Sequence, residues 1–193
     1  MFDALYDWPV EKRWRNQTQP APIVVAIIRR PPLNPAGDEK FLLIQRNSQP
    51  YAGRWALVGG KWDFGETLDR AITREVWEET GLETTFSGLK GLVSERLVPG
   101  NDQNGSPAHF LIFVCLLEPG SGEAREQDEG AVGWFSQIEI DDLQARQAII
   151  SSDYAMLQQF SAADTMSHFE VEMLHTTAAG QLAADMVRFE QIS

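Results

Sequence analysis

The sequence predicts a mixed α/β fold, an α/β/α sandwich in which helices cover both faces of a mixed β-sheet. Three observations support this prediction. The chain has 193 residues, of which 43% are hydrophobic and 23% are charged, enough for one globular domain with a sizeable core. Strands and helices interleave along it without regular strand–helix–strand repetition. Residues 108–117 are apolar on both sides of an extended chain, which is typical of a strand covered on both faces.

Short apolar runs bounded by Gly- and Pro-rich stretches predict the strands. In order along the chain, they are Ile23–Ile28, Phe41–Ile44, Trp55–Val58 (ending at Gly59-Gly60), Leu89–Val98, Ala108–Leu117 and Val132–Phe135. Cys115 shares one side of the fifth strand with Leu111 and Phe113, so we expect a core thiol there. Alternating apolar residues between Phe169 and Phe189 predict a terminal hairpin that turns near Ala179-Gly180.

Three segments have helical character. The clearest is Leu68–Thr80, where Thr67 can cap the first turn and Gly81 can end the helix in the left-handed conformation. Ile138–Leu143 is expected to open another helix, and Gln144–Phe160 continues with helical periodicity.

These elements divide the chain into three parts. Residues 1–20 form an aromatic-rich N-terminal arm, residues 21–165 the main domain, and residues 166–193 a hairpin packed on the domain or extending it. We expect the arm to pack on the edge of its own domain, with a dimer contact as the alternative. Homodimerisation is left open by the sequence.

The charge of the chain excludes several classes of partner. It has 16 Lys and Arg against 28 Asp and Glu, a formal charge of −12. This balance argues against nucleic-acid polymers and anionic membrane surfaces, which are bound through basic residues. One cysteine rules out an internal disulfide framework, and neither a signal peptide nor a long apolar span is visible. We therefore expect a soluble cytoplasmic protein.

The helix Leu68–Thr80 carries an unusual set of carboxylates. At about 100° per residue, Glu75 and Glu79 share a face beside the apolar stripe, and Glu78 adjoins them. Like charges at this spacing repel, and burial beside the core adds a desolvation cost. The arrangement makes sense if a hard divalent cation sits there, because Mg²⁺ prefers carboxylate and water oxygens. Arg74 can pair with one carboxylate, and Glu66 can add another from the preceding loop.

The segment from Gly60 to Leu82 resembles the Nudix signature, G-x5-E-x7-R-E-U-x-E-E-x-G-U, in which U is a bulky aliphatic residue. Every fixed position matches, namely Gly60, Glu66, Arg74, Glu75, Val76, Glu78, Glu79, Gly81 and Leu82. The resemblance extends from about Ile23 to Phe160, leaving out the arm and the terminal hairpin. Val58, before Gly59-Gly60, stands where many relatives have proline.

The resemblance implies a Nudix-type fold whose catalytic motif is a loop–helix–loop. It implies a hydrolase that cleaves the pyrophosphate of a nucleoside diphosphate linked to another group, such as a (d)NTP, a nucleotide sugar or ADP-ribose. The expected cofactor is Mg²⁺ or Mn²⁺, and the expected partner is this small nucleotide substrate. The cation would neutralise pyrophosphate oxygens and lower the pKa of a bound water.

The same resemblance suggests residue roles by motif position. Glu75 and Glu79 resemble the main metal ligands, Glu78 an additional one, and the carbonyl of Gly60 or Gly59 another donor. Arg74 resembles the orienting arginine and Glu66 an auxiliary carboxylate. The family often places another glutamate, a further expected metal ligand, about five residues before the last-strand tryptophan, here Trp134. Glu129 has that place, with Glu126 and Asp128 as competitors. The general base stays open among Glu75, Glu78 and Glu129.

Contacts to the substrate are less constrained by the sequence. Candidates for stacking on a base are Trp62, Phe64 and His109, with Tyr51 and Trp55 as further aromatics near the expected cleft. Arg46 and Arg54 are candidates for contacting phosphate. For each of these side chains, a structural or solvated role is the competing interpretation.

A catalytically silent Nudix-type module that senses a nucleotide is the alternative function. Such regulators often carry a basic DNA-binding region, but residues 136–193 contain only Arg146 and Arg188 against nine acidic residues. No glutamate of the signature is lost either. We therefore favour the hydrolase.

Overall fold

The computed structural model describes residues 17, 19–32, 37–48, 51–97, 108–162, 164–166, 168–178 and 181–192, with the backbone alone for residue 97 and from residue 168 onward. Most of the predicted arm, the loop at 98–107 and the hairpin turn at 179–180 lie outside these residues. No helix in the described part of the chain is long and apolar enough to cross a membrane.

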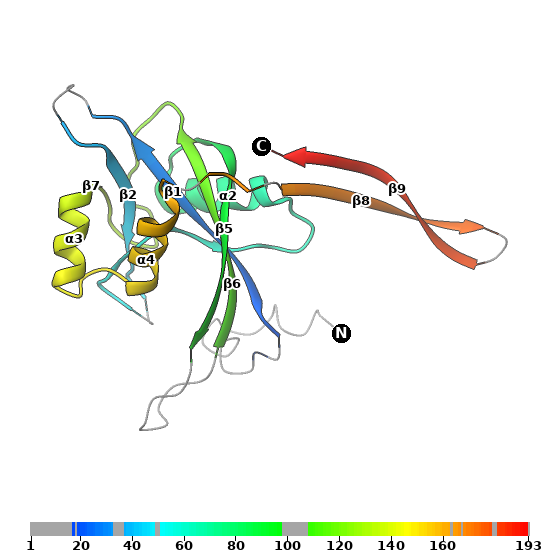
Figure 1. Cartoon of the computed structure of the whole chain (residues 1–193), viewed down its shortest axis with the longest axis horizontal. Coiled ribbons are helices and arrows are strands. Elements are labelled where there is room, and N and C mark those ends of the chain that lie inside the picture. Colours follow the sequence, from blue (N-terminus) through cyan, green and yellow to red (C-terminus); the bar gives the residue numbers. More distant parts are fainter. Residues whose placement is uncertain are drawn as a thin grey trace.

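A seven-stranded mixed sheet forms the centre of the molecule (Figure 1). Its path runs β3-β2-β1-β6-β5, while β4 pairs with β1 and β7 pairs with β2. The β1–β6 pair is parallel and the other pairs are antiparallel. The strands are β1 (Ala21–Arg30), β2 (Lys40–Gln45), β3 (Trp55–Ala56), β4 (Val58–Lys61), β5 (Thr84–Leu97), β6 (Ala108–Pro119) and β7 (Val132–Ser136).

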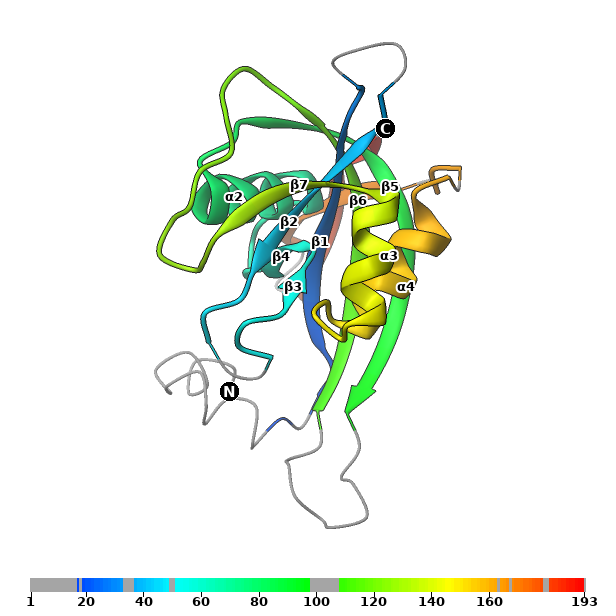
Figure 2. The same cartoon turned by 90° about the vertical axis from the view of Figure 1, so that its left-hand side faces the viewer.

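Helices cover both faces of this sheet, so the predicted sandwich is confirmed. Helix α2 (Leu68–Thr80) lies on one face, and α3 (Gln137–Ala145) and α4 (Ser151–Phe160) lie on the other (Figure 2). The core is accordingly split into two apolar layers. One packs Leu68, Ile72 and Val76 of α2 against the sheet, and the other packs Ile140, Leu143 and Leu157 of the opposite helices.

Strand β6 contributes to both layers, as its sequence predicts. Cys115 and Leu117 face the α2 layer, whereas Ile112, Val114 and Leu116 face the other. The Cys115 thiol is fully buried, and burial raises its pKa. It is therefore a core side chain.

Helix α2 has the predicted bounds. It ends at Gly81, whose φ of 66° is left-handed and whose N–H donates to the carbonyl of Trp77 at 2.8 Å. The other end differs in detail, because Thr67 has the extended backbone of an N-cap but its side chain makes no capping hydrogen bond. The negative charge of Asp69, in the first turn, still interacts favourably with the helix dipole.

Two predicted elements are interrupted in the structure. The expected strand Trp55–Val58 is two strands that break at Leu57, because the Leu57 N–H donates to the Asp153 carboxylate at 2.8 Å rather than to a strand. Strand β4 then continues through both glycines to Lys61.

The helical periodicity expected over Gln144–Phe160 is also broken, so that prediction is wrong between α3 and α4. Gln147 there is left-handed (φ 56°), and Ile149 forms a bridge with Trp55 of β3. The Trp55 N–H donates to Ala148 at 2.8 Å, and the Ile150 N–H donates back to Trp55 at 2.9 Å. Because residues 148–150 pair with the edge strand β3, the helix does not continue through them.

The predicted terminal hairpin is present as β8 (His168–Ala178) and β9 (Gln181–Ile192), paired only with each other in the described structure. Figure 1 shows the pair extending away from the sandwich. The division of the chain into arm, domain and hairpin stays a prediction.

Candidate functional site

The candidate site lies where β4 passes along helix α2. The Gly59 N–H donates to Glu79 Oε2 at 3.0 Å, and Gly60 lies directly against the Glu75 carboxylate. A Cβ on Gly60 would overlap Glu75, and one on Gly59 would overlap the backbone of β1. The paired glycines therefore allow the strand to approach both carboxylates closely.

Glu79 is the most deeply placed of these carboxylates, with 6% of its surface exposed. Burial raises its pKa to about 9, although the hydrogen bond from Gly59 opposes this shift. The neighbouring charges of Glu129 and Glu75 raise it further. A buried carboxyl surrounded by carboxylates is costly unless a cation shares the site.

Glu75 interacts electrostatically with Glu79 and, like Glu79, with Glu129. Burial raises its pKa, Arg74 lowers it, and the charges of Glu78 and Glu129 raise it again. Glu129 enters this group from the loop between β6 and β7. Its carbonyl accepts from the Asn47 N–H at 3.2 Å, which fixes the loop beside β2. The structure thus brings Glu129 close enough to the two helix carboxylates to raise their pKa values, and its role as a metal ligand stays a prediction.

Arg74 connects the remaining acidic residues. Its guanidinium donates to both oxygens of Glu66 at 2.8 and 2.9 Å, to Glu75 at 2.8 Å and to Glu78 at 3.0 Å. It also donates to the Lys61 carbonyl at 3.0 Å, which ties the helix to the end of β4. These bonds lower the pKa of Glu66 and raise that of Arg74. The arginine therefore sets the carboxylate rotamers.

The carboxylates of this site supply oxygen donors that could hold a hard divalent cation. No group of three acidic, His or Cys side chains in the described part of the chain already has ligand geometry, and Arg74 holds Glu75 and Glu78. The coupling among Glu75, Glu79 and Glu129 nevertheless marks a place where positive charge would relieve both repulsion and desolvation. Oxygen donors of this kind suit Mg²⁺ or Mn²⁺.

Two of the aromatic candidates lie in the loop that precedes α2. Trp62 donates its indole N–H to the Glu66 carbonyl at 3.0 Å and packs edge-on against Phe113, with ring centroids 5.0 Å apart. It thus anchors the loop. Phe64, at the tip of the same loop, is 97% exposed.

The other candidates come from the β2–β3 turn and from the start of β6. Arg46 and Arg54 flank the turn between β2 and β3, where Arg54 stacks over Tyr51 at 5.7 Å and Arg46 is close enough to lower the pKa of Asp153. His109 contacts the Ser94 hydroxyl at 2.8 Å, and its backbone is bonded to the Gln17 side chain. Contacts of these three residues with the substrate stay a prediction.

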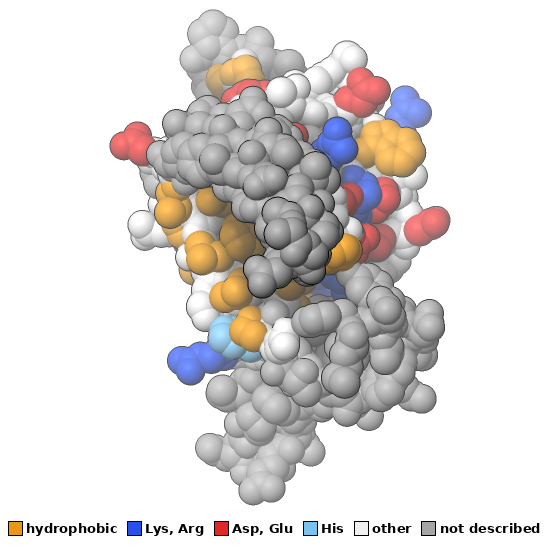
Figure 3. All heavy atoms as spheres, turned by 90° about the vertical axis from the view of Figure 1, so that its right-hand side faces the viewer, with side chains coloured by type: hydrophobic (Ala, Val, Ile, Leu, Met, Phe, Trp, Pro, Cys, Tyr) orange, Lys and Arg blue, Asp and Glu red, His pale blue; other side chains and the backbone are white. Residues whose placement is uncertain are grey.

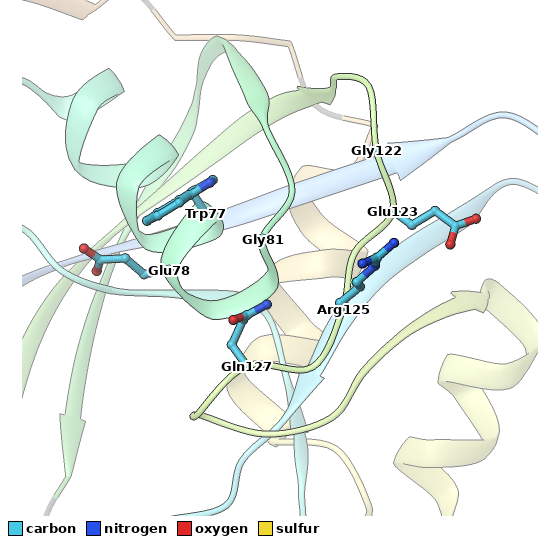
Figure 4. A pocket seen from close by; sticks show the side chains of 7 residues that line it. All are labelled: Trp77, Glu78, Gly81, Gly122, Glu123, Arg125 and Gln127. Atoms are coloured by element: carbon cyan, nitrogen blue, oxygen red, sulfur yellow. The ribbon is translucent and has the colours of Figure 1, made fainter.

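Sequence reasoning missed a hollow beside the site. It has a volume of about 450 Å³ and lies between the end of α2, at Trp77 and Gly81, and the β6–β7 loop, at Arg125 and Gln127 (Figure 4). The exposed Trp77, on the helix side opposite the apolar stripe, was the one available signal. The role of Asp153, whose carboxylate accepts a hydrogen bond from the Leu57 N–H, was also missed.

A model of the NUDIX domain matches residues 21–160. The chain belongs to the Nudix family. An ADP-ribose pyrophosphatase of Methanocaldococcus jannaschii is 36% identical over 127 residues, covering 66% of this chain and 68% of that protein. A putative 8-oxo-dGTP diphosphatase 2 of Mycobacterium tuberculosis is 36% identical over 103 residues, covering 53% and 68% respectively.

A solved structure agrees with this family membership. The crystal structure of a MutT NUDIX hydrolase from Burkholderia pseudomallei covers 73% of this chain and 98% of its own, with 33% identity and a TM-score of 0.56. The expectation of a Nudix pyrophosphohydrolase is confirmed at the level of enzyme class.

Proposed function

We propose that this Nudix enzyme is a metal-dependent hydrolase of a nucleoside diphosphate linked to another moiety. The observation that carries the proposal is the coupled group of Glu75, Glu79 and Glu129 against the Gly59-Gly60 backbone. The relatives named ADP-ribose pyrophosphatase and 8-oxo-dGTP diphosphatase support nucleotide substrates. Among these, ADP-ribose is the first substrate to test, because that relative matches the longer stretch of the chain.

The metal ligands in this proposal are Glu75 and Glu79, with Glu78 and the Gly60 carbonyl as additional donors. Bound there, Mg²⁺ or Mn²⁺ would supply neutralising charge at the pyrophosphate and acidify a water molecule. Glu79 is positioned by the Gly59 N–H, whereas Glu75 is oriented by Arg74. Glu66 accepts two hydrogen bonds from the same guanidinium and keeps it in place.

The general base in this proposal is Glu129. Arg74 binds one oxygen of Glu75 at 2.8 Å and one oxygen of Glu78 at 3.0 Å, so these oxygens are already engaged. Glu129 approaches from a separate loop, close enough to share a hydrogen bond with Glu79. It can accept the proton of the attacking water as the water oxygen approaches phosphorus in line with the leaving group.

Replacing Glu79 by Gln tests the site. We expect the variant to lose at least about 100-fold in Mg²⁺-dependent cleavage of ADP-ribose, because several kcal/mol of charge stabilisation are removed. The measurement is chromatographic separation of AMP and ribose 5-phosphate, with the melting temperature as a check of folding. Glu118→Gln, at the exposed end of β6, is the matched control and should keep wild-type activity.

Full activity in Glu79→Gln would refute the assigned metal site. A panel of (d)NTPs, nucleotide sugars and dinucleoside polyphosphates, with Mg²⁺ and then Mn²⁺, identifies the preferred substrate and cation. If the wild-type protein binds members of the panel but cleaves none, the silent nucleotide-sensing module becomes the correct function.

A further inference from the structure

The hollow next to the carboxylates has the size of a small-molecule subsite. Its volume of about 450 Å³ falls within the usual range for ligand pockets. Gly81 lies on the helix side of the hollow and, having no side chain, leaves the space open; a Cβ there would come within 3.2 Å of the Gln127 amide nitrogen. Figure 4 shows Trp77 and Arg125 on opposite sides of Gly81, from the helix and from the loop.

Trp77 provides an aromatic surface at this place. Single exposed apolar side chains are ordinary on proteins, so exposure alone assigns nothing. Here, however, the indole is 59% exposed and borders hollows on two sides, the second of about 390 Å³ and lined also by Thr73 and Thr85. An exposed indole beside an open hollow can stack on a planar ring.

Arg125 provides a positive charge in the same hollow as Trp77. It is the one basic residue of the acidic segment 118–130. Its backbone N–H donates to the Thr80 carbonyl at 2.8 Å, which fixes it at the end of α2. Within the described residues, its guanidinium has neither an ion pair nor a hydrogen bond. Its exposed side chain lines the hollow together with Glu78 and Glu123, and its guanidinium can pair with the phosphate of a ligand.

Glu78 links the hollow to the carboxylate group. Glu78 lines the hollow and accepts from Arg74, which also binds Glu75. A ligand that fills the hollow therefore reaches the edge of the proposed metal site without crossing the core.

We propose that this hollow binds the nucleotide half of the substrate, with the base stacked on Trp77 and the adjoining phosphate held by Arg125. The inference rests on the proposed function and adds to it the surface that selects a base-bearing substrate. Gln127 lies at the rim of the hollow and offers an amide that can hydrogen-bond to the sugar or base.

Binding of AMP, measured by equilibrium dialysis with Mg²⁺ present, tests the inference without any turnover. Trp77→Ala should weaken AMP binding about tenfold, whereas Trp77→Phe should restore most of it, since stacking survives. Ribose 5-phosphate, which lacks the base, should bind wild type and Trp77→Ala equally. Arg125→Ala should also weaken AMP binding. Ile138→Ala, on the exposed face of α3, is the matched control.

Kinetics with ADP-ribose give a second measurement. Trp77→Ala should raise KM about tenfold and leave kcat within about twofold, because the stacking contact is made equally in ground and transition states. AMP binding to Trp77→Ala at wild-type strength would overturn the inference, as would a wild-type protein that does not bind AMP. Loss of binding in Phe64→Ala alone would place the base on the other loop. Failure of the proposed function differs from these, since it shows as absent wild-type turnover.

Discussion

Replacing Asp153 by Asn should flatten the pH dependence of stability. Asp153 lies at the start of α4, 9% exposed, and one of its oxygens accepts the Leu57 N–H at 2.8 Å. Burial raises its pKa from 3.8 to about 7, and the hydrogen bond from Leu57 and the charge of Arg46 only partly oppose this. Asn keeps an acceptor for Leu57 and removes the ionisation, so the change is a clean probe.

The direction in which the free energy of unfolding changes with pH follows from proton binding by Asp153. Because the pKa of Asp153 is higher in the folded protein, the folded state holds a proton that the unfolded chain loses from about pH 4 upward. The free energy of unfolding should therefore fall as pH rises from about 4 to 7 and level off above. A shift from 3.8 to about 7, at about 1.4 kcal/mol per unit, corresponds to an upper limit of roughly 4 kcal/mol.

Urea unfolding between pH 4.5 and 8 measures this effect as a difference between variants. Other groups with raised pKa values, such as Glu79, contribute equally to both proteins and cancel. Asp153→Asn should gain stability relative to wild type with increasing pH, by several kcal/mol across the range. Asp164→Asn, at an exposed position, is the control and should run parallel to wild type. Parallel curves for Asp153→Asn would show that the carboxyl ionises normally in its buried place.

Two further predictions concern the catalytic group. Glu129→Gln should lower kcat at saturating Mg²⁺ by about 100-fold, whereas Glu126→Gln on the same loop should stay near wild type; the reverse result would mean that Glu126 is the base. Gly60→Ala should lower kcat by at least about tenfold with a nearly unchanged melting temperature, because its Cβ displaces the Glu75 carboxylate. Wild-type kcat in that variant would mean that Glu75 can move without consequence.

The parts of the fold that local chemistry determines could be predicted from the sequence. Gly81 supplies the left-handed stop of α2, and the apolar stripe with Glu75 and Glu79 beside it defines the face that meets β4. Strand β6 could be predicted because both of its faces are apolar. In each case the signal lies within a few residues of the feature.

Features that depend on distant contacts could not be predicted. The break between α3 and α4 arises because Ile149 bridges to Trp55, far away in the sequence. Asp153 is indistinguishable in the sequence from any acid at a helix start, and only the fold places the Leu57 N–H beside it. Trp62, a candidate for stacking on a base, also packs against Phe113 of β6, a contact between residues far apart in the sequence.

The contacts between the β3–β4 corner and the segment before α4 determine how short a working chain can be. Three hydrogen bonds make these contacts. Two join Trp55 to Ala148 and Ile150 before α4, and the third joins the Leu57 N–H to Asp153 in the first turn of α4. This corner leads directly into Gly59 and Gly60. A chain truncated after Ala145 would keep every residue of the signature, yet it would lose the support that aligns the glycine strand with Glu75 and Glu79. We therefore expect a catalytic unit to include at least the start of α4, up to Asp153.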